Sequence, residues 1–423
     1  MKKVLVYPCG TEIGLEIYRA LHNSIHYEIY GGSCSYDHGR FVYENHIDNL
    51  PFITDKSNED EIKEFNKIID EYNFDFIYPA MDGVLTVFSK YRQLLTPKVV
   101  APDFETTCIT RSKKNTYALF EKRLPVPYEY IDKSLINNFP IFVKPSVGQG
   151  SSGAQLIRNS SELEPINEEG MLFLEYLPGS EYTIDCFTNQ SGELLYARGR
   201  ERKRIKGGIS VNAVFVDRPE FMEYAKIINA NLKQRGGWFF QLKEAEDGKL
   251  KLLEIASRIA GTSAIVRNIG VNLPLLTLDV FDHHSIDSVI VNEFDIELDR
   301  ALSNTFKIDL VYDSVYVDYD DTIVVNGKVN LEIINFLYQC INNNKKIILL
   351  SKHDGDLEEE LIMYRIKEIF DKIIHLERNQ DKKDYIKGNS IFIDDSYGER
   401  KQVWDACKVP VFDTHMIECL MER

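Results

Sequence analysis

The sequence lacks any apolar run long enough to cross a membrane. Its N-terminus, Met1 to Pro8, is basic and then apolar, but this run is too short for the hydrophobic segment of a secretory signal. A basic excess is also missing, since the formal net charge is −16. This charge argues against sequence-independent nucleic-acid binding and against an anionic membrane surface. We therefore expect a cytoplasmic protein whose partners are neither nucleic acids nor membranes.

Cysteine is sparse and has no pairing pattern. The 7 cysteines are scattered, odd in number and never spaced as Cys-x-x-Cys, as expected for buried thiols in a reducing cytoplasm. The remaining composition, 44% hydrophobic and 27% charged, is ordinary for a folded protein. A length of 423 residues predicts roughly two to four domains with sizeable cores. The sequence leaves a homo-oligomeric state open.

A glycine-rich loop follows an apolar strand that carries Lys144. Glycines let backbone N–H groups converge on an anion, and the lysine adds a fixed positive charge, so the loop predicts a flap over nucleotide phosphates. A dinucleotide fingerprint is the alternative, but it needs a helix inside the glycines, whereas 154–157 has a strand pattern. A flexible hairpin is the other alternative. The loop residues are Gly148, Gly150, Ser151, Ser152 and Gly153.

The first hundred residues alternate between apolar strands and amphipathic helices. Strands are expected at 4–7, 27–30 and 74–79, with helices between them. This alternation predicts a small, parallel, Rossmann-like sheet. Asp82 follows the last of these strands, where it is either a ligand-binding residue or the N-cap of a helix.

The middle of the chain places polar residues within apolar strands. Gln241 and Glu254 lie in two strands joined by a turn at 246–248, and Arg258 follows. Buried carboxylates are rare unless they are paired or bound to metal. A basic segment, 198–206, is either a substrate-binding surface or a solvated strand face. Candidates to hold an anionic substrate group are Arg198, Arg200, Arg204 and Arg267.

Residues 106–281 resemble the ATP-grasp superfamily, and with the preceding unit they resemble its carbamoyl-phosphate-synthase-like and amino-acid-ligase branch. The resemblance implies that Lys113 and Lys144 contact ATP phosphates, and that Arg258 faces the transferred phosphoryl group. It further implies that Glu175 and Leu177 flank adenine, that Glu181 binds ribose, and that Gln241 and Glu254 hold Mg²⁺ or Mn²⁺. Many members carry Asn two residues after the metal-binding Glu, whereas this chain has Ala256.

Three apolar strands near the C-terminus each end in Asp or Ser. Asp318, Ser351 and Asp394 follow strands at 314–317, 347–350 and 390–393. Parallel strands bring such ends to one edge of a sheet, so these side chains are expected to gather there. Helix N-caps are the alternative for each residue taken singly.

Residues 313–423 resemble the haloacid-dehalogenase superfamily. The resemblance implies that Asp318 is a nucleophile, that Asp320 is the general acid and base, and that Lys383 offsets charge. Thr322 and Ser351 would bind phosphoryl oxygens, and Asp318, Asp320 and Asp394 would hold Mg²⁺, with Asp395 nearby. Only about thirty residues separate successive motifs, which leaves no room for a cap domain.

The sequence therefore predicts a multidomain α/β protein. The expected parts are a Rossmann-like pre-ATP-grasp domain (1–105), an α+β ATP-grasp domain (106–292), a linker (293–312) and a capless haloacid-dehalogenase-like domain (313–423). The expected function is bifunctional: an ATP-dependent carboxylate–amine ligase fused to a phosphatase that removes a phosphate from the ligation product. Its substrates would be a small carboxylate and an amine, with or without a phosphate on the amine. The alternative, suggested by Ala256, is a phosphatase with a degenerate ATP-grasp module.

Overall fold

The computed structural model describes residues 1–148, 150, 152–301, 303, 306 and 308–422. It contains two compact units, Met1–Leu302 and Ser303–Arg423, which we call unit 1 and unit 2 and describe separately. None of the helices in the described residues is both long and apolar enough to span a bilayer.

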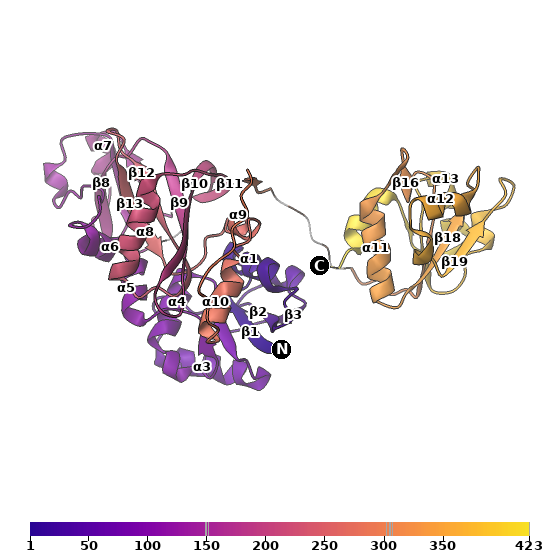
Figure 1. Ribbon diagram of the computed structural model, residues 1–423, viewed down its shortest axis with the longest axis horizontal. Coiled ribbons are helices and arrows are strands. Elements are labelled where there is room, and N and C mark those ends of the chain that lie inside the picture. The colour runs from indigo at the N-terminus through magenta and orange to yellow at the C-terminus, as the bar shows by residue number, and fades with distance from the viewer. Residues whose placement is uncertain (149, 151, 302, 304–305, 307, 423) are drawn as a thin grey trace. The chain divides into compact units, whose positions relative to one another are not determined.

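Unit 1 begins with a five-stranded parallel sheet in the order β3-β2-β1-β4-β5 (Figure 1). This confirms the parallel, Rossmann-like arrangement predicted from the alternating pattern. Helix α3 shows why the pattern is readable: Asn58 and Glu61 form a capping box, and Ile62, Phe65 and Ile69 face the core. The strands are β1 (Lys2–Tyr7), β2 (Tyr27–Gly32), β3 (Asn45–Ile47), β4 (Phe76–Pro79) and β5 (Lys98–Val99); the helices are α1 (Glu12–Leu21), α2 (Gly39–Val42), α3 (Glu59–Ile69) and α4 (Asp82–Lys90).

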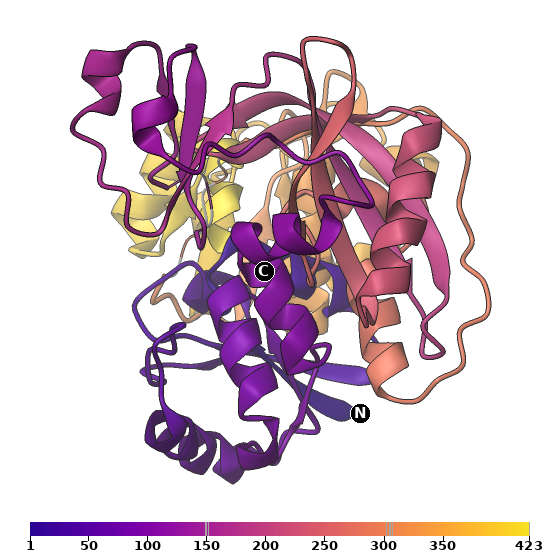
Figure 2. The same ribbon diagram turned by 90° about the vertical axis from the view of Figure 1, so that its left-hand side faces the viewer.

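Two antiparallel sheets follow. The small sheet has the order β7-β6-β8 and carries the glycine loop between β6 and β7; Figures 1 and 2 show it in magenta at the end of unit 1 away from the indigo N-terminal sheet. The large sheet has the order β13-β12-β9-β10-β11-β14. Its elements and those of the small sheet are α5 (Phe104–Arg111), α6 (Lys113–Phe120), β6 (Ile141–Pro145), β7 (Gln155–Ile157), α7 (Ser160–Leu163), β8 (Met171–Glu175), β9 (Glu181–Thr188), β10 (Leu194–Lys206), β11 (Ile209–Phe215), α8 (Pro219–Asn231), β12 (Gly236–Glu244), β13 (Leu250–Ala256), α9 (Ala264–Arg267), α10 (Leu273–Phe281) and β14 (Glu297–Asp299).

The expected boundaries within the first three hundred residues do not separate independent cores. Val4 and Val6 of β1 share one apolar cluster with Phe187 of β9, Ile265 of α9 and Leu278 of α10. The expected linker, 293–312, also requires correction at its start, because β14 pairs with β11 as the edge strand of the large sheet. Arg300 continues this attachment through an ion pair with Glu12 of α1 at 3.0 Å.

Unit 2 is built on a five-stranded parallel sheet in the order β19-β18-β15-β20-β21. The three strands singled out in the sequence are its neighbouring central strands, and they run in the same direction, as expected. Apolar side chains of α11 and α12 pack on the sheet in one cluster. The elements are β15 (Ser314–Val317), β16 (Val324–Val325), β17 (Lys328–Val329), α11 (Leu331–Asn342), β18 (Lys346–Ser351), α12 (Leu357–Met363), β19 (Lys372–His375), β20 (Ser390–Ile393), α13 (Tyr397–Cys407) and β21 (Val411–Phe412).

Candidate active sites

Three adjoining cavities lie along unit 1. The first, of about 100 Å³, is lined largely by apolar groups, including Phe142, Leu174 and Leu177, and by Glu175 and Glu181. The second, of about 130 Å³, shares Lys144 and Glu181 with the first and adds Lys113, Gln241 and Glu254. The third, of about 240 Å³, shares Arg202, Gln241 and Glu254 with the second and adds Arg200 and Arg258. The first cavity is thus lined mainly by apolar groups, the second by charged groups of both signs, and the third by three arginines.

Two lysines approach the second cavity from different elements. Ser112 caps α6 by accepting a hydrogen bond from Asn115 N, which places Lys113 at the first position of that helix. Lys113 Nζ lies 3.5 Å from Glu254 Oε2. Lys144 comes from β6, is only 8% exposed, and donates to the carbonyl oxygen of Leu253 at 3.4 Å. Burial, helped by the charge of Lys113, lowers the pKa of Lys144 to about 8.

The glycine loop borders the same cavity. Gly148, Gly150 and Ser152 line it, and Gly150 and Gly153 adopt positive φ values of 60° and 75°, which side chains rarely allow. Lys113 Nζ donates to Gly148 O at 3.3 Å, so the loop already touches one of the lysines. Ser151 lies outside the described residues. The strand that follows, β7, agrees with a flap between two strands rather than a dinucleotide fingerprint.

Oxygen donors face the lysines across the second cavity. Gln241 and Glu254 are directly opposite each other on β12 and β13. This pair of hard oxygen donors fits Mg²⁺, which proteins commonly bind through one or two side chains while phosphates and water complete the shell. Ala256 adds no ligand, and it is buried in a small apolar cluster with Phe239 and Ala260.

Arg258 is held by Asp82. Its guanidinium forms an ion pair with the carboxylate of Asp82, which is the first residue of α4 and not its N-cap. Burial alone would raise the pKa of Asp82, but the neighbouring Arg258, with Arg111 and Lys113, lowers it below its usual value. The ionised carboxylate therefore fixes the arginine where it lines the third cavity, and the expectation that Arg258 faces the transferred phosphoryl group stays a prediction.

The third cavity is lined by only one of the four arginines proposed as anion ligands. Arg200 lies there, and its Nη1 has no hydrogen-bond partner among the described residues, although its Nε binds the buried Asp185 at 2.6 Å. Arg202, which was not proposed, also lines the cavity and is paired with Glu181. The other three arginines, Arg198, Arg204 and Arg267, are paired with Asp217, Asp299 and Glu16.

Part of the sequence that forms these cavities matches a known protein family. Residues 167–301 match a protein-family model described as "ATP-grasp in the biosynthetic pathway with Ter operon". The match covers β8 of the small sheet and the whole large sheet, β9 through β14, and it includes Gln241, Glu254 and Arg258. Unit 1 has the ATP-grasp fold. No curated protein matches the sequence significantly.

Solved structures extend the likeness to 69% of the chain. The biotin carboxylase–β-γ-ATP complex of Campylobacter jejuni has a TM-score of 0.56 at 13% identity, covering 69% of this chain and 74% of the other. The biotin carboxylase domain dimer of Hydrogenobacter thermophilus 2-oxoglutarate carboxylase, solved with MgADP and bicarbonate, gives 0.56 at 15%, covering 69% and 72%. N5-carboxyaminoimidazole ribonucleotide synthetase of Thermotoga maritima gives 0.54 at 16%, covering 69% and 78%. At these identities the likeness establishes the fold alone.

A separate cluster of carboxylates lies at the sheet edge of unit 2. Ligand oxygens of Asp318, Asp394 and Asp395 all lie within 4.8 Å of one another. Lys382 Nζ lies 2.7 Å from both Asp318 and Asp394. Burial, reinforced by the charge of Asp318, raises the pKa of Asp394 to about 7, and burial also raises the pKa of Asp318. A divalent cation would relieve this crowding of hard oxygen donors, so the set fits Mg²⁺.

Two expectations for this cluster require correction. Lys383 points away from it and pairs with Asp381, whereas the preceding Lys382 is buried between the two aspartates. Asp320 is not in the three-carboxylate group of the described residues, because its carboxylate turns toward His353 Nδ1 at 3.0 Å. The third carboxylate of the group is that of Asp395 instead.

Two hydroxyl residues that were expected to bind phosphoryl oxygens, Thr322 and Ser351, lie close to the carboxylates, and that role stays a prediction. The backbone N–H of Asp395 donates to Thr322 Oγ1 at 3.0 Å, which ties the two loops together. Ser351, at the end of β18, is buried beside β15 and only 1% exposed. Thr322 therefore contacts the cluster through Asp395. Ser351 is the last residue of β18, the neighbour of the strand β15 that leads to Asp318.

Proposed function

We propose that unit 1 is an ATP-dependent ligase that joins a carboxylate to an amine through an acyl phosphate. The observation that carries the proposal is the order of the three cavities, which matches adenine, polyphosphate and an anionic acceptor. The apolar cavity suits an adenine ring beside Glu175 and Leu177, and Glu181 lies where ribose hydroxyls would reach it. The proposal gains support from the ATP-grasp fold and from similar structures that were solved with β-γ-ATP and with MgADP.

The residues would divide the chemistry between them. Lys113 and Lys144 would neutralise the polyphosphate, and Gln241 and Glu254 would hold Mg²⁺, which offsets charge on the moving phosphoryl group. A carboxylate oxygen attacks the γ-phosphorus and ADP leaves; the amine nitrogen then attacks the acyl carbon and phosphate leaves. The glycine loop would exclude water that otherwise hydrolyses the acyl phosphate.

The ligase proposal is tested by ADP release during screening of carboxylate and amine pairs. Glu254→Gln should lower ADP release by at least about a hundredfold, because a metal-binding charge facing the phosphates is lost. Glu244→Gln is the matched control, because Glu244 lies on β12 but pairs with Arg218, outside the lysine-lined cavity. Equal activity of the Glu254→Gln variant and the wild-type protein would contradict the metal-binding role.

We propose that unit 2 is a Mg²⁺-dependent phosphatase of the haloacid-dehalogenase type. Asp318 would attack the phosphorus and form an aspartyl phosphate, and Asp320 would protonate the leaving oxygen and then activate water. The supporting observation is the buried contact of Asp318 and Asp394 with Lys382. Asp318→Asn should abolish hydrolysis of p-nitrophenyl phosphate, whereas Asp321→Asn, three residues along the same loop, should not.

We further propose that the two activities follow one another on a single product. A phosphorylated amine would be ligated first, and unit 2 would then remove its phosphate. The wild-type protein should release about two phosphates per ADP, one from the acyl phosphate and one from the product. Asp318→Asn should return the ratio to about one, and a wild-type ratio of one would contradict sequential action.

The alternative is a phosphatase whose ATP-grasp unit binds nucleotide without turnover. Ala256 favours it, because this position supplies no second-metal ligand. Magnesium-dependent ATP binding with no ADP release across the same substrate screen would support this alternative over the ligase.

A further inference from the structure

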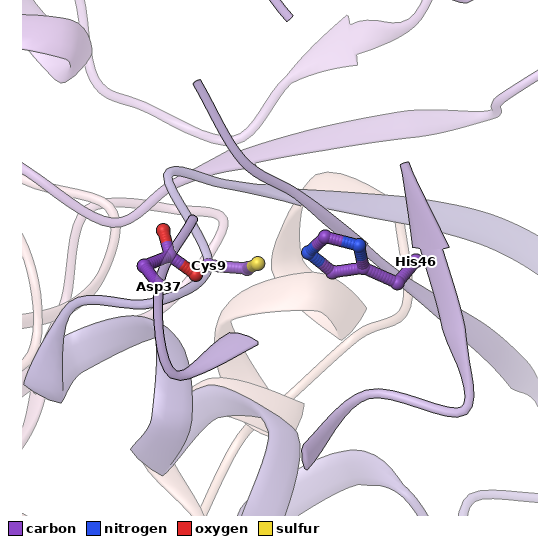
Figure 3. A group of neighbouring side chains, drawn as sticks. All are labelled: Cys9, Asp37 and His46. Carbon is purple, nitrogen blue, oxygen red and sulfur yellow. The ribbon is translucent and has the colours of Figure 1, made fainter. Parts of the chain in front are cut away.

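A cysteine, an aspartate and a histidine converge at the carboxyl edge of the N-terminal sheet, apart from the residues assigned above. Cys9 follows β1, Asp37 lies between β2 and α2, and His46 is in β3. One potential ligand atom from each lies within 4.8 Å of the other two. Figure 3 shows the sulfur of Cys9 between the Asp37 carboxylate and the imidazole of His46. No sequence motif predicts this group, because its members, Cys9, Asp37 and His46, are not close together in the sequence.

The backbone is shaped to let these side chains approach. A Cβ at Gly39 would lie 2.2 Å from Cys9 Sγ, and a Cβ at Gly10 would lie 2.2 Å from the Asp37 carboxylate carbon. Any side chain at either position would therefore push a member of the cluster away. Gly31, the strand partner of His46, would place a Cβ 2.9 Å from the same sulfur. Gly39 and Gly31 thus keep the space around Cys9 Sγ open, and Gly10 does the same for the Asp37 carboxylate.

His46 is oriented as metal-binding histidines commonly are. Its Nε2 faces the cluster, 3.0 Å from Ser33 Oγ, while its Nδ1 lies 3.5 Å from the Asp48 carboxylate. A carboxylate beside the far nitrogen favours a proton there and leaves the near nitrogen as a ligand. Asp48 is itself held by Arg40 at 3.2 Å. Asp48 and Arg40 thus support His46 from outside the group of three potential ligands.

Ser33 occupies the remaining side of the cluster. Its Oγ lies 3.1 Å from Cys9 Sγ and 2.9 Å from Asp37 Oδ1. Both Ser33 and Cys9 are completely buried. The inner side of the site is therefore closed, as in structural metal sites, while Asp37 and His46 are half-buried at its outer side.

We propose that Cys9, Asp37 and His46 bind one structural Zn²⁺ ion, with Ser33 on the fourth side. Thiolate, imidazole and carboxylate together are a donor set that suits zinc better than the oxygen-preferring Mg²⁺. Tetrahedral zinc places its ligand atoms about 3.5 Å apart, so the cluster closes with side-chain adjustments of about 1 Å. The ion would fasten the segment from Ser33 to Asp48 onto the β1–α1 turn. That turn matters because Thr11 and Glu12 line the third cavity.

The test measures metal content of the full-length, untagged protein. After loading with zinc and dialysis against buffer containing magnesium, the wild-type protein should retain about one zinc per chain. Cys9→Ser and His46→Gln should each lose it, whereas the control variants Cys108→Ser and His26→Gln should keep it. Ser33→Ala should also keep it, because water can replace a hydroxyl on the fourth side.

Cobalt substitution tests the ligands directly and tolerates partial loss of stability. The cobalt-loaded protein should show the visible bands of tetrahedral Co²⁺ and a thiolate charge-transfer band that disappears in Cys9→Ser but persists in Cys108→Ser. The proposal is overturned if the wild-type protein retains no zinc, or if Cys9→Ser and His46→Gln retain as much as the wild-type protein. In that case the cluster is a hydrogen-bonded network around Ser33.

Discussion

At the scale of single residues, Lys144 combines burial with a functional charge. A lysine that is 8% exposed and close to a second lysine loses much of its preference for the charged form. Its strand position was predictable from the apolar run around it. Its lowered pKa was not, because that depends on Lys113, which reaches the same cavity from a distant helix.

Nucleotide affinity should therefore depend on pH in a defined direction. In the free protein Lys144 loses its proton near pH 8, while phosphates favour the charged form, so the Kd for ATP should rise about fivefold from about pH 8 to about pH 9. Calorimetric titration in buffers of different ionisation enthalpy should show proton uptake above pH 8. Lys144→Arg keeps its charge and should bind with little pH dependence in this range. An equal slope in both proteins would contradict the assignment.

The lowered pKa of Lys144 also makes the free energy of unfolding depend on pH. Between about pH 8 and the ordinary lysine pKa of 10.5, the unfolded chain holds the proton that the folded protein has lost. The contribution of Lys144 to the free energy of unfolding therefore increases with pH in this window. Chemical denaturation of the wild-type protein and of Lys144→Met, which cannot titrate, should diverge over that window and agree in their pH slope below it.

The adjacent lysines of unit 2 give a second test at this scale. Lys382→Met should lower hydrolysis of p-nitrophenyl phosphate by at least about a hundredfold, because Asp318 and Asp394 would face each other without the cation between them. Lys383→Met should change it by less than about twofold, since Lys383 is bound to Asp381. Circular dichroism of both variants checks that they fold. The reverse order of effects would restore the sequence-based assignment of Lys383. Sequence spacing alone could not separate two neighbours in one helical turn.

At the scale of elements, apolar periodicity predicted most strands and helices, but it failed where pairing rather than pattern defines a strand. β14 is short and polar, and it exists because its backbone pairs with β11. The same limit applies to the cavities: the strands carrying Gln241 and Glu254 were predictable, but their direct opposition follows from the register of β12 against β13. Likewise, Arg198 and Arg202 are four residues apart and lie on the same face of β10, so choosing between them requires knowing which part of the strand reaches the cavity.

The contact of α8 with β10 supplies a test of how the arginines are placed. A Cβ at Gly199 would lie 2.1 Å from Phe221 Cδ2 of α8, so Gly199→Ala should force the helix and strand apart. Overpacking of this kind costs about 1–3 kcal/mol of unfolding free energy. Because Arg200 is the next residue of β10, ligase activity should fall together with stability. Denaturant unfolding that matches the wild-type protein would show that the contact relaxes freely.

At the scale of the whole molecule, the two units have separate cores and separate candidate sites. The clusters that hold unit 2 together contain only its own residues among those described, and the same is true of unit 1. A ligand that binds one unit should therefore stabilise that unit alone, by an amount set by its concentration and affinity. Sequence motifs could anticipate this division, since each set of motifs is confined to one stretch of chain.

Differential scanning calorimetry can separate the two units. Magnesium with a non-hydrolysable ATP analogue should raise the unfolding temperature of the ATP-grasp unit and leave the other transition in place. Magnesium with beryllium fluoride, which mimics an aspartyl phosphate, should do the opposite, and Asp318→Asn should abolish that second shift. If either ligand moved both transitions equally, the units would be energetically coupled. Their fusion would then do more than keep two activities on one chain, because occupancy of one site would be felt at the other.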